Sequence, residues 1–217
     1  MKRLKITILS LLGIGLILLL SCNKDKNEII SSPMTIGQVD ESIILEKFNP
    51  SKMLFGELSI KGNDSIYSDS IAIDYDKDGI FDFKVGFYYE INDSGSFSET
   101  TDGIRTYSPY TIKKSWIQNL SETEFNAELK RQFVYRHDSL EIIDNSTTNW
   151  VNSDSKLTIA ETGSGILIDY NEMENIDNPN TYIVFRKKSN KELKFGWFRI
   201  NPKKTNGIEL FEYAYQK

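Results

Sequence analysis

Residues 74–82 hold the densest group of side chains that could do chemistry, and they read D-x-D-x-D-G-x-x-D. Calcium takes about six to eight oxygen ligands, and calcium loops supply them from alternate positions around a glycine at the sharp turn. The pattern therefore predicts a calcium site, with Gly79 giving the positive φ that the turn requires. The expected ligands are the carboxylates of Asp74, Asp76, Asp78 and Asp82 and the main-chain carbonyl of Ile80.

The same loop could instead be an acidic hairpin turn without an ion, because Asp-Gly is a common turn pair. Two like charges ~4 Å apart repel by ~1 kcal/mol in water and by more near protein. Several such pairs in one turn favour a bound cation. The position that is a bidentate glutamate in EF-hands is Val85, so an EF-hand is not expected. We expect a structural ion, bound with the ~10⁻⁴–10⁻³ M affinity of extracellular calcium modules.

Cys22 is the second candidate for chemistry, and it is the only cysteine of the chain. A basic start and an apolar run over residues 6–20 are typical of a secretory signal. Residues 19–22 read L-L-S-C and look like the lipobox of bacterial lipoproteins. The resemblance implies cleavage before Cys22, acylation of that cysteine with chains such as palmitate, and attachment to a membrane. By resemblance to the sorting pattern of these lipoproteins, Asn23 in place of aspartate favours the outer membrane of a Gram-negative cell over retention at the inner membrane. The domain could face either the periplasm or the cell surface.

The alternative is an ordinary signal peptide followed by a chance cysteine. On the lipoprotein interpretation, residues 1–21 are the signal peptide, 22–39 the lipidated cysteine and a flexible tether, and 40–217 one domain.

Removal of residues 1–21 takes away three of the 26 cationic residues and none of the 31 acidic ones, so the net charge becomes −8. This charge argues against nucleic acid as a partner, because phosphates require a basic face. We interpret the scattered basic pairs, such as Lys187 with Lys188, as solvated strand ends.

The sequence contains few residues in the arrangements that catalytic sites require, and we expect a protein without enzymatic activity. No cysteine nucleophile is left for the folded domain, and His137 is the sole histidine. A serine nucleophile elbow of the G-x-S-x-G type is also missing from the sequence. A glycosidase with paired carboxylates remains an alternative hypothesis, because acidic residues are plentiful and their spacing in the sequence does not fix their distance in space.

The elements that must position these residues are mostly strands. Hydrophobic side chains alternate over many short runs. The clearest run covers residues 80–89, where alternation places five aromatic or aliphatic side chains on one face: Phe81, Phe83, Val85, Phe87 and Tyr89. Asn-Gly at 206–207 lies between two such runs and predicts a hairpin. One segment, residues 121–131, opens with capping-box spacing and continues at helical spacing, which predicts a helix. We expect a mainly β fold, an antiparallel β-sandwich of about nine or ten strands with one short helix.

Four short motifs in this order resemble a family of uncharacterised secreted or lipid-anchored bacterial β-proteins. They are the D-x-D-x-D-G-x-x-D-F loop at residues 74–83, Y-I-x-F-R at 182–186, F-G-W at 195–197 and Y-A-Y at 213–215. The resemblance implies a compact β-domain with a calcium loop and implies no activity. In the F-G-W motif, alternation places Phe195 and Trp197 on one face, and we expect both to pack in the core.

Two functional hypotheses remain, from different classes. The first is a binding module of unknown ligand, with a glycan as the candidate that Trp116 and Trp150 would contact. Each of these tryptophans could equally be folded back on the core. The second is a structural or assembly protein of the cell envelope that recruits another protein through a sheet edge.

Overall fold

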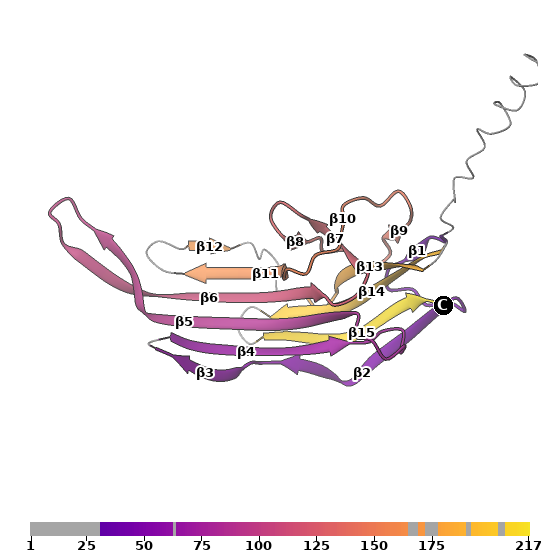
Figure 1. Ribbon diagram of the computed structural model, residues 1–217, viewed down its shortest axis with the longest axis horizontal. Coiled ribbons are helices and arrows are strands. Elements are labelled where there is room, and N and C mark those ends of the chain that lie inside the picture. The colour runs from indigo at the N-terminus through magenta and orange to yellow at the C-terminus, as the bar shows by residue number, and fades with distance from the viewer. Residues whose placement is uncertain (1–30, 63, 165–168, 172–177, 190–191, 204–206) are drawn as a thin grey trace, which may run out of the picture. The chain divides into compact units, whose positions relative to one another are not determined.

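The computed structural model describes residues 31–217 except 63, 165–168, 172–177, 190–191 and 204–206. Ser31–Lys217 form one compact unit. This unit is mainly β, and its described part contains no helix, as Figure 1 shows. The predicted signal peptide and Cys22 lie outside the described residues.

Fifteen strands are described, because hydrophobic and polar side chains alternate along most of this unit. The expected number of nine or ten was too low, because five of the strands have only two or three residues and leave no alternation to recognise. The strands of the N-terminal half are β1 (Met34–Thr35), β2 (Ile43–Leu54), β3 (Glu57–Lys61), β4 (Asp64–Ile73), β5 (Phe83–Glu99), β6 (Arg105–Asn119) and β7 (Thr123–Glu128). The remaining strands are β8 (Phe133–Val134), β9 (Ile142–Ile143), β10 (Trp150–Val151), β11 (Leu157–Ser164), β12 (Asp169–Asn171), β13 (Thr181–Ser189), β14 (Glu192–Lys203) and β15 (Gly207–Gln216).

One large sheet contains 13 of these strands, in the order β2-β15-β14-β13-β7-β8-β11-β6-β5-β4-β3. Off this path, β10 pairs with β7 and β12 pairs with β11. Almost every pair is antiparallel, and the parallel contact is the single Thr158–Phe133 pair of β11 and β8. The predicted hairpin is confirmed, since β14 and β15 are antiparallel partners from Gly196↔Tyr215 to Lys203↔Gly207.

The core lies where side chains of β5 meet those of β7, β13 and β14. The ring of Phe83 is 5.5 Å from the rings of Phe125 and Phe185 and 5.6 Å from that of Phe198, centroid to centroid. All four are buried. Residues distant in sequence therefore meet around Phe83, the first residue of the strand that follows the acidic loop.

A second, two-stranded sheet forms from β1 and β9, with Met34 opposite Ile143. Met34, Ile36 and Ile143 are buried. The Gln216 side-chain amide donates to the Ser32 carbonyl at 2.8 Å, which joins this segment to the end of β15. Residues 31–39, which the sequence analysis assigned to the flexible tether, thus contact the folded domain where they are described.

The predicted helix at residues 121–131 is wrong, because this segment contains β7. Phe125 pairs with Phe185 of β13 on one side and with Val151 of β10 on the other. Thr123, Phe125 and Ala127 are all buried, at the two-residue period of a strand, whereas Leu129 of the expected helical stripe is 64 % exposed. Pairing with two neighbouring strands outweighs the local helical spacing.

Candidate metal centre

The acidic loop joins β4 to β5 and is closed by a hydrogen bond from the Asp82 N–H to the Ile73 carbonyl, at 2.8 Å. Gly79 has φ +88°, as expected from its place in the pattern, and Lys77 has φ +59°. Two left-handed residues allow the chain to reverse sharply and turn successive side chains inward.

Three of the predicted ligands come together in this loop. Carboxylate oxygens of Asp74, Asp76 and Asp78 lie within 4.8 Å of one another. Main-chain donors orient two of them: the Gly79 N–H donates to Asp74 Oδ2 at 2.9 Å, and the Ile80 N–H donates to Asp78 Oδ1 at 2.8 Å. Asp76 Oδ1 is buried and has no hydrogen-bond donor among the residues that the structure describes. This cluster could hold a metal ion, although exposed acidic groups also cluster without one.

Asp82 contacts a different set of groups. It is fully buried, its Oδ2 accepts from the Tyr75 N–H at 3.1 Å, and its Oδ1 accepts from the Ser121 hydroxyl at 3.0 Å. Burial raises the pKa of the Asp82 carboxyl, and this outweighs the opposing effect of the Lys187 ammonium. Ile80, whose carbonyl was the remaining predicted ligand, has an exposed side chain.

The interpretation of Lys187 as a solvated strand end is wrong, because this residue of β13 is largely buried against the acidic loop. Its ammonium lies 2.8 Å from Asp76 Oδ2, 2.9 Å from Asp82 Oδ1 and 3.7 Å from Asp78 Oδ2. Burial opposes its charge, but the hydrogen bonds to Asp76 and Asp82 raise the pKa of Lys187 overall. Alternation along β13 carried a usable signal, because Lys187 is on the same face as the buried Phe185.

The predicted glycan contacts both lie against the fold. Trp116 of β6 is 6 % exposed; a Cβ on Gly86 would lie 2.2 Å from its ring, and the Lys156 ammonium is 4.0 Å from the ring centroid. Trp150 of β10 donates from its indole nitrogen to the Thr147 carbonyl at 2.8 Å. Trp150 also packs 5.9 Å from the Phe195 ring. The prediction of core packing for Phe195 and Trp197 is confirmed, as both are buried.

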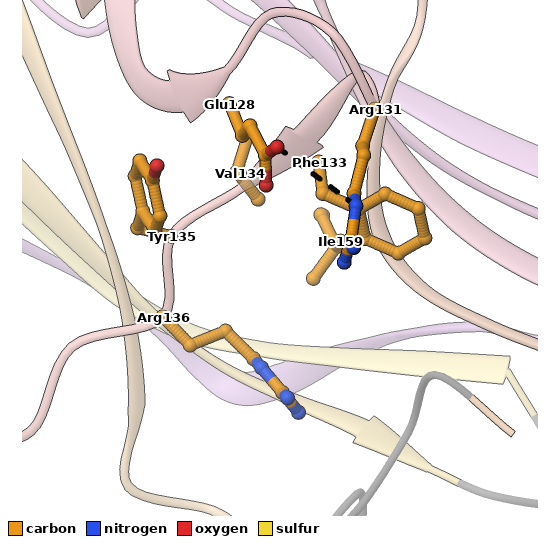
Figure 2. Close-up of a pocket in the computed structure, with 7 residues that line it drawn as sticks. All are labelled: Glu128, Arg131, Phe133, Val134, Tyr135, Arg136 and Ile159. Atoms are coloured by element: carbon orange, nitrogen blue, oxygen red, sulfur yellow. Dashed lines mark ion pairs between the residues drawn. The ribbon is translucent and has the colours of Figure 1, made fainter. Parts of the chain in front are cut away.

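Two shallow hollows open on the described surface. One, of about 410 Å³, is lined by Trp116 together with Tyr88, Gln118 and the lysines Lys84 and Lys156. The other, of about 270 Å³, lies at β8, and Figure 2 shows the residues that line it. They are Glu128, Arg131, Phe133, Val134, Tyr135, Arg136 and Ile159. Hydroxyl, carboxylate and cationic groups line both hollows, a composition that suits a polar ligand.

The sole histidine is engaged in a structural arrangement near this second hollow. His137 Nδ1 lies 2.7 Å from Glu141 Oε2, and Nε2 lies 3.0 Å from Asn126 Oδ1. The Asn126 amide nitrogen is also within donating distance of the Thr148 carbonyl. The ring therefore joins the segment after β8 to β7.

Comparison with known proteins gave no match to a protein-family model, to a curated protein or to a solved structure. The three C-terminal motifs of the family resemblance lie in the adjacent strands β13, β14 and β15. Membership of that family stays a prediction. Among the described residues, no helix has the length and apolar character needed to cross a membrane.

Proposed function

We propose that this chain is an exported lipoprotein, anchored through acyl chains on Cys22, whose antiparallel β-sandwich domain is stabilised by calcium and serves as an interaction module. The outer membrane of a Gram-negative cell is the proposed location. The lipobox pattern of residues 19–22 supports the anchor. Contact between the β5 face and the β13–β14 face supports the sandwich.

The observation that carries the calcium proposal is Asp76 Oδ1, a buried carboxylate oxygen that lies beside the oxygens of Asp74 and Asp78 and has no donor in the described part of the chain. A buried acceptor without a partner loses its hydrogen bonds to water on folding and forms none in exchange, which costs free energy. The loop holds four carboxylates, and Lys187 is the cation that contacts three of them. One ammonium leaves a formal excess of negative charge, which a divalent cation would neutralise.

Thermal unfolding of the full chain in detergent tests the calcium site, measured with millimolar calcium and again with a chelator. Millimolar calcium is about a tenfold excess over a dissociation constant of ~10⁻⁴ M, which adds ~1.4 kcal/mol to the free energy of unfolding. We expect Asp74→Asn with Asp78→Asn to remove this gain and Asp154→Asn, in an exposed loop, to keep it. Equal melting temperatures with calcium and with chelator would end the calcium proposal.

Binding is proposed in preference to catalysis, with an envelope protein or a glycan as partner. The hollow over Trp116 favours a polar ligand, since aromatic, hydroxyl and amide groups line it. Lys156 lies at the exposed side of the Trp116 ring. The variant Lys156→Ala therefore removes a cationic group from the lining of the hollow and leaves the buried indole in place. A glycan array that stays blank for the wild-type chain would count against a glycan. The alternative function is envelope assembly through a sheet edge, and a glycan-active enzyme ranks below both.

A further inference from the structure

Strand β3 is a free edge of the large sheet. It is the terminal strand of the sheet order and pairs on one side only, with β4, among the strands that the structure describes. All five of its residues are exposed. Figure 1 shows β3 along the border of the sheet, below β4. Its outward N–H and C=O groups are available to another strand.

The apolar side chains of β3 are unusual for such an edge. Leu58 is 53 % exposed and Ile60 is 74 % exposed, and alternation places both on the same face. Natural edges are commonly blunted by proline, by a bulge or by an inward-pointing charge. The ladder of β3 and β4 runs without a register shift from Glu57 to Lys61, and the strand contains no proline. The charges of β3 are confined to its two ends, so its centre presents an unblunted edge to a second strand.

The order of residues in β3 identifies the partner. The strand reads E-L-S-I-K, with opposite charges at its two ends and an aliphatic residue on each side of Ser59. When a second copy of this strand runs antiparallel with Ser59 opposite Ser59, Glu57 faces Lys61 and Leu58 faces Ile60. A parallel pair in the same register would instead place Glu57 on Glu57 and Lys61 on Lys61, which is repulsive.

We propose that two copies of this chain associate through β3, pairing antiparallel about a two-fold axis at Ser59 and continuing the sheet from one copy into the other. The interface has two symmetric ion pairs between Glu57 and Lys61 and two aliphatic pairs between Leu58 and Ile60. Only five residues of each copy take part, so the contact is weak in dilute solution. Attachment of both copies to one membrane would raise their effective concentration and favour the dimer.

The charge pattern gives the first test, by sedimentation of the full chain in detergent across a range of concentrations. Glu57→Lys alone, or Lys61→Glu alone, places like charges opposite each other at both symmetric positions. We expect each change to raise the dissociation constant about tenfold, since cross-strand charge pairs are attractive and like pairs are not. The double variant Glu57→Lys with Lys61→Glu restores both pairs and should return within about twofold of wild type.

The register gives the second test, by oxidative crosslinking in membranes that contain the full chain. A two-fold antiparallel pair brings only the central residue next to itself, so Ser59→Cys should form disulfide-linked dimers. Ser153→Cys, in a loop far along the chain, is the matched control, and the wild-type chain shows any crosslink through Cys22. A monomer at every concentration without a Ser59→Cys crosslink overturns the proposal. A dimer that is insensitive to the charge variants and crosslinks equally at Ser153→Cys overturns it too. Neither readout depends on calcium.

Discussion

Asp82 is a carboxylate with no access to solvent, held by the Lys187 ammonium, the Ser121 hydroxyl and the Tyr75 N–H. A buried charge requires this kind of compensation, because its hydration is lost on folding. Lys187 has a second role, since the same ammonium contacts Asp76 and Asp78 in the loop. The Lys187 ammonium therefore joins the acidic loop to β13 and also neutralises the charge of the buried Asp82 carboxylate.

Replacement of Lys187 by methionine should destabilise the domain, because it leaves Asp82 buried without its counter-ion. Loss of one partner from a buried pair costs ~3 kcal/mol or more. Lys188→Met is the matched control, as Lys188 is the next residue and is exposed, and it should change stability by less than ~0.5 kcal/mol. Urea unfolding of both variants in chelator measures the difference. Similar free energies of unfolding for the two would show that the ion pairs at Asp82 contribute little.

At the scale of elements, alternation in the sequence was enough to predict the strands around the site and not enough to predict β7. Phe83, Val85 and Phe87 lie on one buried face, as their two-residue spacing indicates. Phe81, expected on the same face, precedes β5 and is 56 % exposed, so the start of this strand was predicted wrongly. The segment around Phe125 contains both a helical stripe and a strand alternation, and only its partners β10 and β13 decide between them. Those partners lie 24 or more residues away, beyond the reach of a local pattern.

The packing of β13 against β14 depends on a glycine that faces an aromatic ring. A Cβ added to Gly196 would lie 2.2 Å from the Phe185 ring and 2.8 Å from the Ala214 carbonyl oxygen. Gly196→Ala should therefore destabilise the domain by about 1–3 kcal/mol through overpacking. Phe185→Leu removes ring atoms from this space, so the double variant should lose less stability than the sum of the two single changes. Strict additivity in chemical unfolding would show that the ring and the glycine do not interact.

At the scale of the whole molecule, the sequence predicted the mainly β class and the acidic loop, whereas the connection of distant parts came only from the structure. Strand β2 near the start of the domain pairs with β15 at its end, from Ile43↔Gln216 to Leu54↔Ile208. Lys187 reaches the loop from more than a hundred residues away. Neither contact can be predicted from the spacing of residues within a short segment of the sequence. The convergence of Asp74, Asp76 and Asp78 was predictable because it lies within one turn.

The proposed anchor belongs to this scale as well, because it decides where the whole domain works. We expect the mature chain to begin at Cys22, with an intact mass that exceeds the polypeptide from residue 22 by a diacylglyceryl group and a further acyl chain. Two or more buried chains hold a protein stably on a bilayer, so the wild type should stay in the membrane fraction after a high-salt wash. Cys22→Ser removes the acceptor thiol and should keep its leader or leave the membrane, whereas Asn23→Ser should behave as wild type. A mature chain with an unmodified Cys22 would remove the anchor, and one that also kept residues 1–21 would remove the extracytoplasmic calcium supply as well.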